Sequence, residues 1–116
     1  MDNQLYDFTE LKQVCGGDES FMEKMIGLFL TTIPDDIKKI EEALKGSDYT
    51  VVKSIAHKIK PSVNYMCKPH LFEDAKTIEN WADNDENMIS KTQKFISSLA
   101  EVINQIREFK ESPKWD

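Results

Sequence analysis

Apolar residues recur at helical spacing along nearly the whole chain, whereas strands have little support. No stretch combines sustained apolar–polar alternation with β-branched enrichment. The spacing predicts a short helix that Asp7 caps and that ends at Gly16–Gly17, where glycine tolerates a left-handed conformation. Longer helices are predicted over 18–44, 47–66, 69–82 and 85–109.

Polar residues and prolines mark the expected helix ends. Asp18 or Ser20 can cap the long second helix, and Glu23 stands three residues after Ser20, as in a capping box. Pro34 lies inside this helix and removes one backbone donor, so a kink is expected there rather than a domain boundary. The polar run 83–85 predicts a turn before the last helix.

Short connections make consecutive helices antiparallel neighbours. The sequence therefore predicts an all-α fold, an antiparallel up-and-down four-helix bundle with a short additional N-terminal helix. A chain of 116 residues fits a single domain over 1–116, with a core at about 5–109. Residues 110–116 are expected to form a frayed tail.

Charge and composition exclude several classes of function. The net charge of −6 disfavours binding to nucleic acid or anionic lipid. Apolar runs reach about four residues, too few for membrane insertion, and the first residues lack the basic region of a signal peptide. We expect a cytoplasmic monomer, in which Cys15 and Cys67 are reduced core thiols rather than a structural bridge.

The second predicted helix carries more apolar surface than one core-facing stripe requires. Its apolar residues spread over an arc of about 200°. One explanation is that the short N-terminal helix covers Ile26 and Leu30 through Phe8, Leu11 and Val14. The alternative is that part of this surface stays open as a docking patch for a partner.

One segment reverses the acidic character of the chain. Positions 49–72 contain no acidic residue, although the whole chain has 21. Its basic and imidazole side chains are Lys53, His57, Lys58, Lys60, Lys68 and His70. Such a local reversal of charge is typical of a site that binds an anion.

His57 is predicted to point away from the core. In the third predicted helix it lies about 200° around the axis from Ile55, which is on the core side. Lys53, four residues earlier, and Lys60, three residues later, share its face, and Asn64 lies further along the same line. The neighbouring cations favour an uncharged and therefore nucleophilic imidazole.

An outward imidazole among lysines has few chemical uses. The segment offers His57 no carboxylate to orient it and no serine or cysteine to activate, so a stand-alone enzyme is disfavoured. A phosphoryl group brings close to two negative charges, which Lys60 and secondly Lys53 are placed to neutralise. His57 is thus either a phosphoryl acceptor or part of a plain solvated helix face.

Residues 56–62, Ala-His-Lys-Ile-Lys-Pro-Ser, resemble the AHxLKGS signature of the histidine-containing phosphotransfer (HPt) domain family. Gly16–Asp18 is similar to the family's GGD junction, and Pro34 matches a frequent mid-helix proline. Ile78–Glu79 corresponds to a common Leu-Glu pair in the following helix. The resemblance covers about residues 5–109.

The resemblance implies a phosphorelay intermediate that is not itself an enzyme. His57 would be phosphorylated on a ring nitrogen, and Lys60 would contact the phosphoryl group. Transfer would run reversibly between His57 and the aspartate of a receiver domain. The receiver would supply Mg²⁺, so no cofactor of the chain's own is implied. The implied partners are response-regulator receiver domains and a hybrid sensor histidine kinase.

Some residues around His57 depart from the family signature, and others are expected to support the site. Pro61 replaces the family's glycine and adds a ring one turn from His57, while Cys67 replaces a later glycine. Ser62 and Asn64 are expected to support the site. Glu79 is expected to face the same groove, where its charge would weaken phosphate retention.

Three residues are candidates for docking a partner: Ile26, Leu30 and Lys58.

Two other hypotheses remain open from the sequence. The first is a non-catalytic helical adaptor that keeps the bundle and has lost transfer competence. The second is a metal site formed by His57, Cys67 and His70, which is disfavoured because their spacing matches no common zinc pattern.

Overall fold

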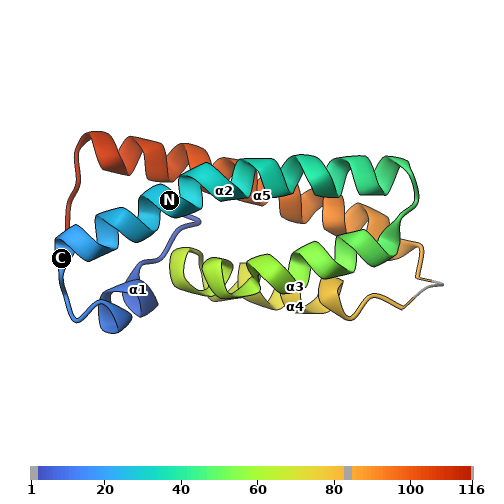
Figure 1. The fold of residues 1–116 in the computed structure, drawn as a ribbon, viewed down its shortest axis with the longest axis horizontal. Coiled ribbons are helices and arrows are strands. Elements are labelled where there is room, and N and C mark those ends of the chain that lie inside the picture. The colour runs from blue at the N-terminus through green and yellow to red at the C-terminus, as the bar shows by residue number, and fades with distance from the viewer. Residues whose placement is uncertain (1–2, 83–84, 116) are drawn as a thin grey trace.

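The computed structural model describes residues 3–82 and 85–115, and within these ranges the chain is helical. Four helices run alternately up and down, and a short one precedes them (Figure 1). Their bounds are α1 Thr9–Val14, α2 Glu19–Lys45, α3 Tyr49–Met66, α4 Pro69–Glu79 and α5 Asn87–Glu111. The all-α bundle with a short N-terminal helix is thus confirmed.

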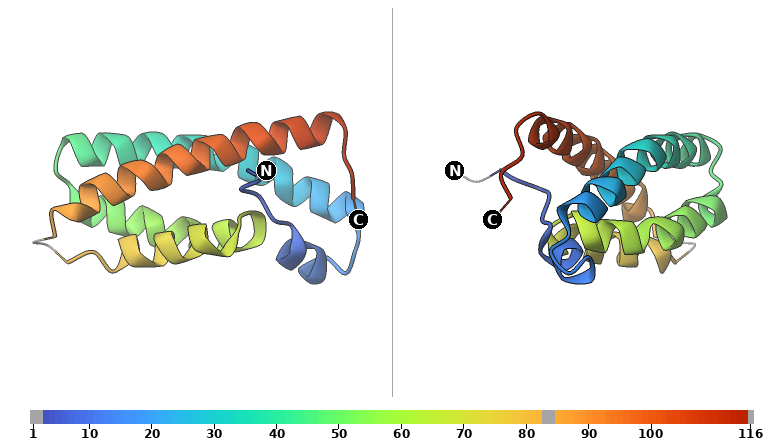
Figure 2. Two further views of the ribbon diagram at one scale, coloured as in Figure 1. Left: turned by 180° about the vertical axis from the view of Figure 1, so that it is seen from behind. Right: turned by 60° about the vertical axis from the view of Figure 1, so that its left-hand side comes forward.

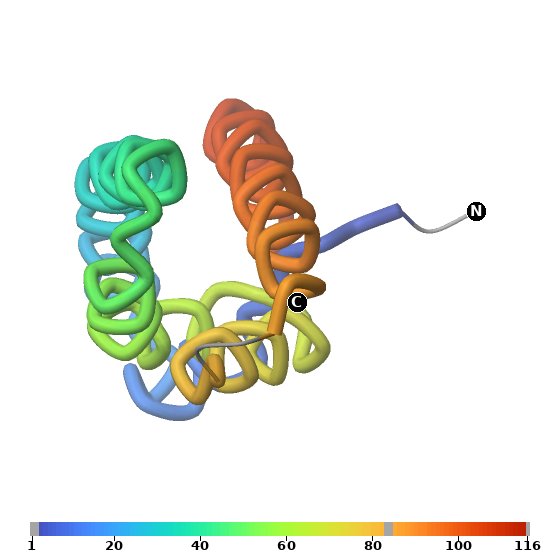
Figure 3. The backbone as a smooth tube through the Cα atoms, turned by 90° about the vertical axis from the view of Figure 1, so that its right-hand side faces the viewer, coloured from blue at the N-terminus to red at the C-terminus, as the bar shows by residue number. Residues whose placement is uncertain are grey.

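The four long helices form a closed ring around one core. Each packs on the next along the chain, and α5 returns to α2, so the end-on view shows four helices around a central axis (Figure 3). Every helix contributes apolar side chains that are at most 1% exposed. Examples from the five helices are Leu11, Ile40, Val52, Leu71 and Leu99. Burial of these stripes is the main stabilising force, because short helices are marginal alone in water.

Aspartates cap the two helices that carry most of the predicted site. The Asp18 carboxylate accepts the Phe21 N–H at 3.2 Å, and the Asp48 carboxylate accepts the Val51 N–H at 3.3 Å. Asp18 rather than Ser20 is therefore the N-cap of α2. Before it, Gly16 and Gly17 both have positive φ values, of 60° and 78°, which glycine adopts without strain.

Two helix ends differ from the predicted ones. The N-cap position of α1 is Phe8 rather than Asp7, although the Asp7 carboxylate accepts the N–H of Thr9, the first helical residue, at 2.9 Å. α4 ends at Glu79 rather than at 82, since Trp81 leaves the helix to bury its ring against Tyr49, with ring centroids 4.5 Å apart. The turn expected at 83–85 falls mostly outside the described residues.

Both internal prolines are accommodated without breaking their helices. α2 continues through Pro34 and α3 continues through Pro61. The axis of α2 changes direction near its middle in two opposite views, in agreement with the expected kink (Figures 1 and 2). Thr31 and Thr32 just before Pro34 donate their hydroxyls to backbone carbonyls one turn earlier, at 2.8 and 2.9 Å.

The two ends of the chain meet at one end of the bundle. Residues near the N-terminus are extended and pair with the α3–α4 connection, where the Lys68 N–H donates to the Leu5 carbonyl at 2.9 Å. Phe8 packs edge-on against Phe109 of α5, and Trp115 packs against Phe109 with centroids 4.8 Å apart. The residues after 109 are therefore not a frayed tail as far as Trp115: α5 continues to Glu111, and Trp115 is held by aromatic contacts.

The short helix α1 makes its main contacts with α3 rather than with α2, where one of the two explanations from the sequence placed it. It packs on α3 and buries Leu11 completely, while Val14 stays 56% exposed. Ile26 is only 1% exposed, so it belongs to the core and is wrong as a docking residue. Leu30 is half-buried, and the apolar surface that α2 leaves open is instead at Phe21 and Leu28.

Both cysteines are free thiols. Cys67 is buried, and this burial raises the pKa of its thiol to about 12. Cys15 is half-buried. In the part of the chain that the structure describes, no helix is long and apolar enough to cross a membrane.

Candidate functional site

α3 presents His57 to solvent, as its helical position predicts. Ile55, Ile59 and Val63 of the same helix are buried in the core, whereas the His57 side chain is 71% exposed. The ring is therefore within reach of a second protein without any change in the bundle.

Glu79 of α4 contacts both His57 and Lys60. One carboxylate oxygen accepts a hydrogen bond from Lys60 Nζ at 2.6 Å, and the other faces His57 Nδ1 in a short contact. α3 and α4 are antiparallel around the connection at Lys68, and His57 and Glu79 stand at equal distances along the chain on either side of it. This symmetry brings Glu79 beside His57.

Glu79 faces the groove beside His57, as the sequence predicts, so the site is not purely cationic although the segment 49–72 contains no acidic residue. The hydrogen bonds from Lys60 and then from His57 hold the pKa of Glu79 below its usual range, although partial burial opposes them. Glu79 is thus ionised at neutral pH and pairs with the lysine that the sequence assigned to phosphate. His57 does have an orienting carboxylate, and it comes from the next helix.

The contact with Glu79 assigns different roles to the two ring nitrogens of His57. An ionised carboxylate only accepts hydrogen bonds, so Nδ1 is the nitrogen that carries hydrogen. In the neutral ring, Nε2 then holds the lone pair. Nε2 is consequently the nucleophilic atom, and the carboxylate fixes the tautomer as it does in other histidine sites.

Lys58 forms an ion pair on the other side of α3. Its Nζ lies 2.9 Å from an Asp36 oxygen of α2, and the Asp36 side chain is only 3% exposed whereas the Lys58 side chain is 63% exposed. Lys58 was a docking candidate, and its side chain is exposed to solvent. Its positive charge, however, is paired with the buried Asp36 carboxylate. The sequence signal for Asp36 was available: it follows Ile33 by three positions and precedes Ile40 by four, on an apolar stripe.

The other predicted site residues lie near His57 along α3. Lys53, Ser62 and Asn64 are half-buried. Pro61 is exposed and remains within the helix. Because proline has no N–H, the carbonyl of His57 lacks its regular helical partner.

The structure does not bring the hypothetical metal ligands together. His70 is exposed in the first turn of α4, and Cys67 is buried at the end of α3. Across the described ranges no three His, Cys, Asp or Glu side chains are grouped so that they would hold a metal ion.

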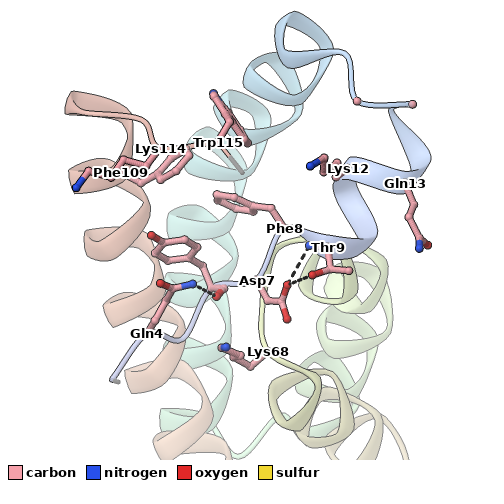
Figure 4. Close-up of a pocket in the computed structure, with 13 residues that line it drawn as sticks. Gln4, Asp7, Phe8, Thr9, Lys12, Gln13, Lys68, Phe109, Lys114 and Trp115 are labelled. Carbon is pink, nitrogen blue, oxygen red and sulfur yellow. Dashed lines mark hydrogen bonds between the residues drawn. The ribbon is translucent and has the colours of Figure 1, made fainter. Parts of the chain in front are cut away.

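A pocket lies between the two chain ends and does not include the His57 site. Aromatic and basic side chains line most of it. The acidic residue Asp7 also lines the pocket, and its carboxylate accepts hydrogen bonds from the N–H and the hydroxyl of Thr9 (Figure 4). Its rings include Phe8, Phe109 and Trp115, which pack on one another. The candidate site is therefore an open helix surface and not an enclosed cavity.

Comparison with known protein families gives one finding. The Hpt domain family matches residues 24–109, about three-quarters of the chain and the whole of α3 and α4. No curated protein and no solved structure matches the chain.

Proposed function

Since the chain belongs to the Hpt domain family, whose members carry phosphoryl groups in two-component signalling, we propose that His57 is its phosphoryl acceptor. The donor is the phosphorylated aspartate of a receiver domain, and the acceptor of the next step is another receiver. The chain is then a carrier between partners and has no autonomous catalytic activity.

The observation that carries this proposal is the exposed His57 ring whose Nδ1 is bound by Glu79. The ring is 71% exposed, and Nε2 is the nitrogen left with a lone pair. Transfer needs this atom to enter the active site of a receiver in line with the aspartyl phosphate. An enclosed histidine would not meet that requirement.

Lys60 supports the proposal as the cation closest to the acceptor in the contact network. It binds the same carboxylate that holds His57, so it lies beside the ring. An incoming phosphoryl group would share this ammonium with Glu79. The remaining charge would be neutralised by Mg²⁺ bound to the receiver, and the chain needs no cofactor of its own.

Receiver domains and a hybrid sensor histidine kinase are the proposed partners. The exposed apolar residues Phe21 and Leu28 of α2, together with half-buried Leu30, provide apolar surface for docking. Contact there would be limited in area, as is typical of transient signalling complexes.

The test is transfer from a phosphorylated receiver in the presence of Mg²⁺. The wild-type chain should acquire phosphate that is labile in acid and stable in alkali, and mapping should place it on His57. The His57→Gln variant is the matched control and should remain unlabelled. Absence of label across a panel of receivers would instead favour the non-catalytic adaptor, and label on His70 would refute the assignment.

A further inference from the structure

The group opposite His57 Nδ1 is a carboxylate, and this has consequences for the phosphorylated ring. A carboxylate can only accept a hydrogen bond, whereas a glutamine amide in its place can either accept or donate. Glu79 is ionised and fixed by Lys60 at 2.6 Å, so it does not turn away easily. It therefore distinguishes a ring nitrogen that carries a proton from one that carries a lone pair.

The proton on Nδ1 can be followed through the transfer that the proposed function implies. The Nε2 lone pair attacks the phosphorus of the acyl phosphate, the N–P bond forms, and the P–O bond to the receiver aspartate breaks. The aspartate leaves as a carboxylate, and the ring becomes a phosphoimidazolium that still carries the Nδ1 proton. Loss of this proton to solvent would point a lone pair at the Glu79 oxygen, which is electrostatically unfavourable.

We propose that Glu79 retains the Nδ1 proton of phosphorylated His57 and thereby keeps it a competent phosphoryl donor. This inference rests on the proposed function. When the N–P bond breaks in the donating step, a protonated ring leaves as neutral imidazole. An unprotonated ring would leave as an anion, which is a far poorer leaving group. Glu79 is thus a positioning residue that acts through His57.

The lysines of α3 act against retention of the proton. These are Lys53 and Lys60, whereas Lys58 of the same helix is paired with Asp36 of α2. α1, which lies beside the carboxyl-terminal end of α3 (Figure 1), carries Glu10 and Lys12. Glu79 is the carboxylate that contacts the ring, so its removal takes away the negative charge beside Nδ1 while the positive charge of Lys60 remains.

The experiment compares donation by the wild type, Glu79→Gln and Glu73→Gln. Glu73 is exposed on the same helix, so the last variant removes an equal charge without touching His57. Each protein is phosphorylated with phosphoramidate, and its transfer to one receiver is measured from pH 6 to 9. The donation rate of Glu79→Gln should begin to fall about one pH unit below the pH at which the wild-type rate falls, so the ratio of the two rates should drop by about tenfold and then level off. The Glu73→Gln ratio should stay flat.

A second measurement uses the wild type alone and does not depend on how the variant folds. The ¹⁵N shift of Nδ1 in phosphorylated His57 reports whether that nitrogen carries a proton. Its titration midpoint should lie at least about one pH unit above that of free phosphohistidine.

The outcomes separate this inference from the proposed function. Phosphorylation of His57 with superimposable pH profiles, or with a midpoint equal to that of the free compound, overturns the role of Glu79 and leaves the carrier function intact. Failure of every receiver to phosphorylate His57 refutes the carrier function, and the inference about Glu79 falls with it.

Discussion

The two sides of α3 carry ion pairs of the same chemistry and opposite accessibility. Towards α2, Lys58 binds the Asp36 carboxylate, whose side chain is 3% exposed; towards α4, Lys60 and His57 share the Glu79 carboxylate, which is 19% exposed. The first carboxylate is shielded from solvent, whereas the second lies at the surface beside an exposed ring. Burial of the acid thus distinguishes a pair that holds two helices together from one that is open to chemistry.

The largest effect expected is the complete loss of phosphoryl acceptance in His57→Gln. The same variant should keep the thermal stability of the wild type, since the ring is 71% exposed and contributes little to the core. Thermal unfolding followed by circular dichroism, beside a receiver transfer assay, measures both. A strong loss of stability would show that the open side of α3 is also structural.

Lys58→Ala should produce the largest loss of stability, because it leaves the buried Asp36 carboxylate without its partner. Buried pairs broken in this way lose about 3–5 kcal/mol, and the exposure of Lys58 reduces the expected loss to about 2 kcal/mol. Urea denaturation provides the value. Lys60→Ala is the matched control and should destabilise less, so equal losses would remove the distinction between the two sides.

Lys60→Ala should slow transfer to His57 by about tenfold, as expected for the loss of one charge-assisted hydrogen bond to the phosphoryl group. Initial rates with a single phosphorylated receiver test this, and Lys53→Ala measured in parallel should show a smaller effect. Unchanged kinetics in Lys60→Ala would mean that this lysine serves only the carboxylate.

A smaller effect is expected from pH. The pKa of Glu79 is lowered in the folded state from an ordinary value of 4.5, so its contribution to stability is fully present above that value. It is lost as the pH falls through the lower folded-state value. The difference in unfolding free energy between wild type and Glu79→Gln should therefore shrink below about pH 4.5. A difference that stays constant down to pH 3 would contradict the ion pair.

No effect on transfer is expected from His70→Ala. His70 is exposed in the first turn of α4, at the opposite end of that helix from Glu79. Its transfer rate should equal that of the wild type. A defect as large as that of His57→Gln would identify the wrong histidine as the acceptor.

Local patterns in the sequence are enough to predict the fold and the exposure of His57. Helical spacing gives the four long helices, and the position of His57 relative to Ile55 gives its outward direction. Helix ends are less predictable where a tertiary contact competes, as at Trp81, which leaves α4 to pack on Tyr49. The bundle ring itself follows from short connections.

To predict a contact between two helices, the register of one helix against the other must be known. Glu79 was predicted to face the groove, and equal spacing around Lys68 would also have paired it with His57. Asp36 and Lys58 have the same relation: like His57 and Glu79 they are 22 positions apart, and they are equally spaced about Ser47 in the α2–α3 connection. Their pairing could therefore have been predicted in the same way. The error at Ile26 has another origin, because the burial of this residue depends on how α2 packs against the neighbouring helices of the bundle.

Pro61 has a consequence for local dynamics at the acceptor. Pro61 has no backbone N–H to donate to the His57 carbonyl. The turn that follows His57 therefore lacks one backbone hydrogen bond of the helix. Such a turn opens at lower free energy than its neighbours. Amide exchange along α3 should therefore be fastest around this turn, which gives the backbone at the acceptor freedom to adjust when a partner arrives.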